Sequence, residues 1–262
     1  MKQDSGWFGR SLMLLVAIPA AFLAPQAGIG AGVTSRDLPA VLHGCGAAPS
    51  SEVDLQVYLH CLTGTLLESN GSTNDRMIAS ALDSLRALRY QAHSEAESLS
   101  SLLSHRSPLY ADRDKRLVVR LRAYVVLTLA DVGMPASAVP TLLEILAHLD
   151  ERIAPLEVAA AARAVRSLSN SGCAFAPYLL AAIAMRVAEE EFSLERYDSG
   201  FPPQEATTVQ LEAVRTLGHV CSARDSEVVE ALRRLARYAG DNLDPRVVIE
   251  AQMALSRMKG VS

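Results

Sequence analysis

The chain has 262 residues, half of them hydrophobic, so it can bury a sizeable core. Its 29 acidic residues against 25 lysines and arginines give a formal net charge of -4, which argues against the basic surface of a nucleic-acid-binding protein, and we expect no nucleic-acid partner. Aromatic residues make up only 5% while alanine, leucine and valine abound, a composition that favours stacked helices over a β-sandwich or barrel.

The amino terminus has the pattern of a secretory signal peptide. Basic residues precede an apolar run, Ser11–Ala24, and small residues follow it up to Ala27. The run is about 14 residues long, shorter than the ~20 that span a bilayer as a helix, and Pro19 interrupts it. We therefore predict a signal peptide over residues 1–27, a flexible leader over residues 28–50, and export to the periplasm or the extracellular space. Membrane contact is expected only if the leader stays uncleaved.

The rest of the chain, from about Ser51, has the spacing of amphipathic helices. Apolar residues recur three and four positions apart, and Gly, Pro, Asn, Asp or Ser breaks the pattern every ~12 to 20 residues. No segment remains that reads as a convincing strand, so the sequence predicts an all-α fold. The predicted helices cover residues 52–69, 73–90, 94–105, 113–131, 136–149, 155–170, 174–190, 203–221, 225–239 and 244–259.

A short pattern recurs along these helices: an alanine, then an apolar residue four and usually seven positions later. The pattern begins at Ala81, Ala123, Ala164, Ala213 and Ala251. Its intervals of about 38 to 49 residues bracket the ~40 to 47 of two-helix repeats and exceed the ~34 of tetratricopeptide repeats. An alanine in the middle of a helix lets the neighbouring repeat approach closely, so we expect these alanines in the core.

The carboxyl-terminal third resembles HEAT repeats. Asp225–Leu235 looks like a HEAT helix, and Leu243–Val247, followed by two alanines and a leucine, looks like the helix start of bacterial HEAT-like repeats. Asp225 and Asp244 suit helix amino-terminal caps. Pro245 suits a first helical position, where its missing N–H costs nothing.

This HEAT-like, armadillo-type resemblance covers about residues 73–259. It implies an α-solenoid, or α-α superhelix, of about five helical-hairpin repeats over residues 51–262, the last of them a half repeat. Proteins of this architecture mostly serve as protein-binding scaffolds, and some bacterial relatives are chromophore lyases. We therefore expect an exported scaffold that binds a protein partner on its solenoid surface without catalysis. The alternatives are a groove-based enzyme of the HEAT-like lyase type and a metal- or redox-binding periplasmic protein.

Motifs of familiar catalytic and cofactor sites are missing from the sequence. It has no Gly-X-Ser-X-Gly elbow, no His-Glu-X-X-His, no phosphate loop and no Cys-X-X-Cys-His. We therefore assign no catalytic residue, no cofactor and no metal site. The mixed-charge run at residues 112–116 predicts a solvated helix start.

Two features offer candidate partner contacts. The longest interval between repeats holds an insertion with Phe192, Tyr197 and Phe201, which either bind a partner or fold back to cover the gap between repeats. Arg233, Arg234 and Arg237 lie on a helix that a HEAT-like stack would place on its concave side, where they would contact an acidic partner. The alternative is ordinary pairing with nearby glutamates on the same helix.

The four cysteines form an even set, which in an exported protein favours disulfides. Cys173 and Cys221 follow the pattern alanines of successive repeats at nearly the same distance, so we predict that they are bonded. Cys45 and Cys61 are then left to pair. The alternative is a zinc or copper site built from His43, Cys45, His60 and Cys61, although its spacing is atypical for such sites.

Overall fold

The computed structural model describes residues 44–46, 49, 51–147, 155–184, 209–238 and 243–259. The chain divides into residues 1–32 and a compact unit, residues 33–262, to which all the described residues belong. In these residues every regular element is helical and no strand occurs, as predicted. No helix in this part is both long and apolar enough to cross a bilayer.

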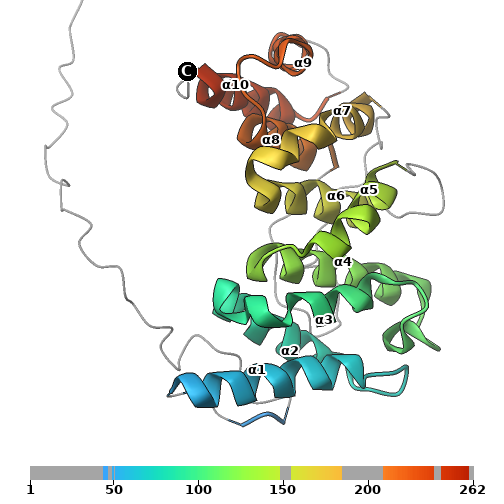
Figure 1. Cartoon of the computed structure of the whole chain (residues 1–262). Helices are drawn as coiled ribbons and strands as arrows, with labels where there is room; N and C mark the ends of the chain where they lie inside the picture. Colours follow the sequence, from blue (N-terminus) through green and yellow to red (C-terminus); the bar gives the residue numbers. More distant parts are fainter. Residues whose placement is uncertain are drawn as a thin grey trace, which may run out of the picture. The chain divides into compact units, whose positions relative to one another are not determined.

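The predicted helices lie close to the observed ones (Figure 1). The α-helices are α1 (Glu52–Leu67), α2 (Asp75–Leu88), α3 (Ala96–Ser100), α4 (Lys115–Val132), α5 (Val139–Ala147), α6 (Pro155–Ala164), α7 (Ala176–Ala184), α8 (Val209–Val220), α9 (Ser226–Ala236) and α10 (Pro245–Lys259). Short 3-10 helices join several of them: η1 (Arg89–Glu95), η2 (Ser101–Leu103), η3 (Pro108–Tyr110), η4 (Ala136–Ala138) and η5 (Val165–Phe175).

The segments predicted at 94–105 and 155–170 are not continuous α-helices but contain 3-10 stretches. The segment predicted at 94–105 is a short α3 between η1 and η2, and the one predicted at 155–170 passes into η5. Serine hydroxyls bond nearby backbone carbonyls there: Ser100 to Glu97 O at 2.6 Å, and Ser167 to Ala164 O at 2.7 Å. Such bonds compete with the regular helix and tighten the turn.

Capping side chains set several helix starts. Ser51 Oγ accepts from the Asp54 N–H at 3.2 Å, and Asn74 Oδ1 accepts from the Arg76 N–H at 2.8 Å. Asp244 caps α10 by accepting from the Arg246 N–H at 2.8 Å, and Pro245 is the first residue of that helix. Each such cap is worth about 1 kcal/mol.

The even-numbered helices pack on one another in chain order: α2 on α4, α4 on α6, α6 on α8 and α8 on α10 (Figure 1). Each odd-numbered helix contacts the even-numbered helix that follows it, α7 on α8 and α9 on α10 for example. The five pattern alanines are all fully buried, at 0% exposure. Their position in the core is the one that the sequence predicts.

Ion pairs join each even-numbered helix, or the segment next to it, to its successor. Arg86 pairs with Asp131 at 2.7 Å (α2 to α4), and Arg122 with Glu157 at 2.5 Å (α4 to α6). Arg166 of η5 pairs with Glu212 of α8, and Arg215 of α8 with Glu250 of α10. In all four pairs, here called the arginine ladder, the arginine belongs to the earlier element and the carboxylate to the later one.

Candidate functional site

A groove of about 470 Å³ lies between α7 and α9. One wall is apolar and comes from α7, and the other comes from α9 and mixes alanine and leucine with charged residues. The lining residues are Leu180, Ile183, Ala184, Glu227, Glu230, Ala231, Arg234 and Leu235. Most of its lining surface is apolar, and it opens to solvent.

Helix periodicity explains both walls. In α7, Leu179 and Ala182 point into the core, which leaves Leu180 and Ile183 half-buried toward the groove. In α9, Val228 and Leu232 are buried, and the groove residues lie on the adjacent side of the helix. The two helices thus present apolar surface that their own cores do not cover.

Charges gather on the α9 wall of the groove. Arg234 Nε lies 3.3 Å from Glu230 Oε1, and Arg233 Nη1 lies 4.0 Å from the other Glu230 oxygen. These side chains are at least half exposed, so each pair is worth at most about 1 kcal/mol and can be exchanged for a contact with a partner. The lining itself holds two carboxylates, Glu227 and Glu230, against one guanidinium.

Two of the three arginines predicted to contact a partner do not line this groove. Arg233 lies on α9 and Arg237 just beyond its end, and both are exposed. Neither lines the groove, whereas Arg234, the third arginine considered on this helix, does. The insertion aromatics Phe192, Tyr197 and Phe201 lie outside the described residues.

Both disulfides join the predicted cysteines. Cys45 is bonded to Cys61 with a Cα–Cα distance of 5.7 Å, and Cys173 to Cys221 with one of 4.9 Å. Cys45 and Cys61 are therefore not free to bind the zinc or copper considered from the sequence. Of the two histidines in that set, His60 is exposed on α1, and His43 lies outside the described residues.

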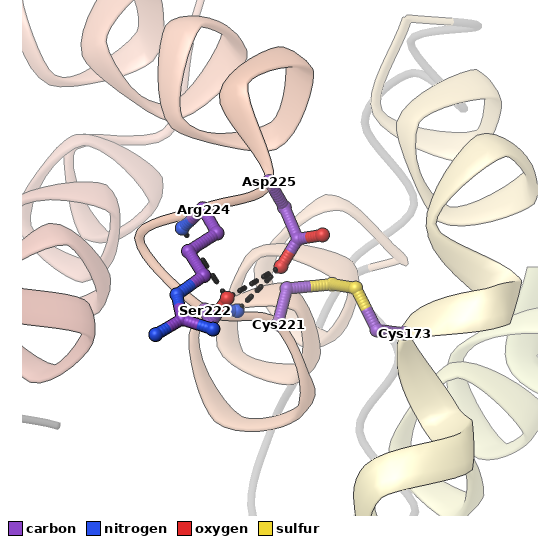
Figure 2. Close-up of a disulfide and its surroundings, with 5 residues drawn as sticks. All are labelled: Cys173, Cys221, Ser222, Arg224 and Asp225. Atoms are coloured by element: carbon purple, nitrogen blue, oxygen red, sulfur yellow. Dashed lines mark hydrogen bonds between the residues drawn. A yellow bond between two sulfur atoms is a disulfide. The ribbon is translucent and has the colours of Figure 1, made fainter. Parts of the chain in front are cut away.

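The bond between Cys173 and Cys221 has a carboxylate beside it (Figure 2). An Asp225 oxygen and the two sulfur atoms all lie within 4.8 Å of one another, the only such group of metal-ligand atoms in the described part of the chain. Because the sulfurs are bonded to each other, the oxidised protein offers only the carboxylate there. The residues therefore do not make a metal centre in this state.

Asp225 does not make the helix cap that the sequence predicts. Its side chain makes no bond to an N–H of α9. Instead its Oδ2 accepts from the Ser222 N–H at 2.7 Å and from the Ser222 hydroxyl at 3.0 Å (Figure 2). The carboxylate thus faces back toward Cys221, because it closes the turn between α8 and α9 rather than starting the helix.

Gly172 brings the two disulfide-bearing turns together. A Cβ at this position would lie 2.8 Å from Val220 Cγ1 and 2.9 Å from the Val165 carbonyl oxygen, closer than real side chains come. Gly172 and Val220 directly precede Cys173 and Cys221 in the chain, so the bond spans a contact that only glycine permits. No motif in the sequence points to this role.

A second hollow, of about 610 Å³, lies at the amino-terminal ends of α2 and α4. Arg113 lines it with its side chain 4% exposed, pairs with Asp75 and donates to the carbonyls of Leu109, Asn70 and Thr73 at 2.7, 2.9 and 2.8 Å. The prediction that residues 112–116 form a solvated helix start is therefore wrong for Arg113. This guanidinium joins two turns and is not available to a ligand.

Two buried tyrosines have strongly raised pKa values, and both lie in the core rather than at the groove. Burial raises the pKa of Tyr124, whose phenol donates to Asp83, and Arg86 lies 5.0 Å from its ring centre. Burial likewise raises the pKa of Tyr110, which donates to the Leu102 carbonyl at 2.5 Å. Each phenol has an internal acceptor, so these shifts reflect packing.

No family model, no curated protein and no solved structure matches this chain. The site therefore has to be interpreted from its own geometry.

Proposed function

We propose that this chain is an exported α-solenoid of HEAT-like repeats that holds a protein partner in the groove between α7 and α9. The packing of even-numbered helices in chain order and the burial of the five pattern alanines support the repeat interpretation. Two disulfides fit an oxidising compartment, which supports export through a signal peptide over residues 1–27.

The observation that carries the proposal is the groove itself. Its α7 wall presents Leu180 and Ile183, and its α9 wall adds Leu235 and a rim of charges. A groove between two helices, apolar inside and charged at its edge, suits an amphipathic helix whose apolar stripe lies along it. The acidic excess of the lining favours a partner with a basic residue opposite Glu227.

No specific observation favours an enzyme. A groove-based lyase would need titratable groups whose environment tunes them for catalysis, gathered at the groove. The strongly shifted tyrosines instead lie in the core with internal partners. The scaffold is therefore the only function that we propose.

The test is site-specific photocross-linking in the native cell envelope. The full chain carries p-benzoylphenylalanine in place of Arg234, which lines the groove, or of Arg116, an exposed arginine of α4 that serves as the matched control. We expect one partner to cross-link from position 234 and not from position 116. Ile183→Asp should abolish that product, because it places a charge on the apolar wall.

Equal labelling from both positions, or none from position 234, would contradict the proposal. A product from position 234 becomes supporting evidence only when its cross-linked peptide is an amphipathic helical segment. The purified partner should then bind the wild-type chain and bind Ile183→Asp at least ~10-fold more weakly.

A further inference from the structure

The disulfide between Cys173 and Cys221 joins the segments that lead into the two walls of the groove. Cys173 lies three residues before the start of α7, and Cys221 lies five residues before the start of α9. The covalent bond therefore ties η5, which leads into α7, to the end of α8, from which a short turn leads into α9. Figure 2 shows the bond beside the turn that leads into α9 at Asp225.

Other contacts hold the two walls to different neighbours. α7 packs mainly on α8 and η5, whereas α9 packs mainly on α10. Direct contact between α7 and α9 is slight. Cys221 directly follows the last residue of α8, and α8 packs on η5, α7 and α10. The walls are therefore joined through α8 as well as through the disulfide and the close contact of Gly172 with Val220.

The two cysteines of the bond differ in exposure. Cys221 is buried, at 8% exposure, whereas Cys173 is half-buried. A thiolate would approach Cys173 Sγ, form a mixed disulfide there, and release the electron pair of the broken S–S bond to Cys221 Sγ, which takes up a proton. The second thiol of a dithiol then attacks the mixed disulfide and frees Cys173 as a thiol, so that one dithiol is oxidised for two cysteines reduced.

We propose that the Cys173–Cys221 disulfide is a redox-sensitive clamp on the partner groove, and that its reduction by a dithiol frees α9 from α7 and weakens docking. The claim that reduction weakens docking rests on the proposed function, because it needs a bound partner. The claim that reduction loosens α9 from α7 does not depend on any partner.

The first experiment measures the walls alone, by hydrogen exchange of the purified full chain. A Cys45→Ser/Cys61→Ser variant keeps only the Cys173–Cys221 bond, so dithiothreitol then reduces one defined disulfide. We expect reduction to speed amide exchange in α9, residues 226–236, at least ~10-fold while α2 and α4 keep their protection. Cys173→Ser/Cys221→Ser should show the same local loosening without any reductant.

Two outcomes would overturn the clamp. Unchanged protection of α7 and α9 after reduction would show that packing alone fixes the walls. Faster exchange throughout the chain would show that the bond holds the whole fold rather than the groove. Far-ultraviolet circular dichroism of the same samples separates local opening from unfolding.

The second experiment measures docking by the cross-link from position 234. We expect its yield to fall at least ~5-fold in Cys173→Ser/Cys221→Ser and to stay unchanged in Cys45→Ser/Cys61→Ser, the matched loss of a disulfide elsewhere. No cross-link in the wild-type protein would reject the proposed function and leave the exchange result to decide the clamp. A full cross-link in the Cys173→Ser/Cys221→Ser variant would reject the redox control of docking.

Discussion

Gly218 of α8 faces Ala254 of α10 so closely that a Cβ at position 218 would lie 2.4 Å from the Ala254 Cβ and 2.8 Å from its Cα. The contact is between a helix backbone and the smallest side chain, so neither partner has a flexible end that can yield. It lies where α8 crosses α10, in the series of even-numbered helices that pack on one another.

Gly218→Ala should therefore destabilise the protein, although alanine is the better helix former. We expect a loss of about 1 to 3 kcal/mol, because the added methyl forces α8 and α10 apart. Gly64→Ala is the matched control, since a Cβ at Gly64 on α1 meets nothing within 4 Å, and it should gain about 0.5 to 1 kcal/mol. Urea unfolding measures the change in the free energy of unfolding for both variants. A gain or a loss in both would contradict the close contact of α8 with α10 at Gly218.

Loss of one partner of the buried Arg122–Glu157 pair should be severe. Both side chains are 3% exposed, and Arg122 also donates to the Leu103 carbonyl at 3.2 Å. Glu157→Gln leaves a buried guanidinium without its counter-charge, so we expect a loss of about 3 to 5 kcal/mol. Glu230→Gln, at an exposed pair, should change the free energy of unfolding by less than about 1 kcal/mol. Similar losses in the two variants would show that the Arg122–Glu157 pair is not desolvated in solution.

Glu250 should make the stability sensitive to acid. Burial alone would raise the pKa of its carboxyl, but hydrogen bonds from Arg257 and Arg215 lower it below the ordinary value of 4.5. Because the folded pKa lies below the unfolded one, the stabilisation is fully present above about pH 4.5 and is lost as the pH falls through the folded pKa. Glu250→Gln should have a lower free energy of unfolding than wild type near neutral pH, and this difference should shrink as the pH falls. Urea unfolding over the acid range measures it, and a constant difference would contradict the lowered pKa of Glu250.

Asp225 should slow reduction of the disulfide beside it. A thiolate approaching Cys173, and the thiolate left on Cys221, both meet the negative carboxylate, and a unit charge about 5 Å away costs roughly 1 kcal/mol in water. Asp225→Asn should therefore be reduced by dithiothreitol about fivefold faster. The Cys45–Cys61 bond of the same molecules is the internal control, and its rate should not change. Mass spectrometry of alkylated cysteines follows both bonds, and equal rates for wild type and variant would show that the carboxylate does not act on the bond.

The sequence predicts the helices well where a local signal marks their ends. Asp244 and Pro245 define the start of α10 because a cap and a first-turn proline act within a few residues. The disulfides could be predicted as well, since the pattern alanines bring Cys173 and Cys221 to neighbouring turns. Asp225 shows the limit of a local signal, because a carboxylate can bond backward to Ser222 as easily as forward into the helix.

Longer-range features escape sequence reasoning for a different reason. The groove depends on which faces of α7 and α9 their neighbours leave uncovered, and that packing involves helices distant in the sequence rather than a short pattern. Arg113 appears in a charged run, yet its environment is set by turns about forty residues earlier in the chain. Such contacts are specified by the assembled core and can be read only from the structure.

The arginine ladder has a direction, and its last two joints also share one register. Arg166 and Arg215 each lie two residues after a pattern alanine, and each pairs with the glutamate directly before the next pattern alanine, Glu212 and Glu250. The first two joints lie at other places along their helices. Only the carboxyl-terminal helices therefore meet one another with the same charges at the same positions, so only there would exchanging one joint for the other leave no unmatched ion at the contact.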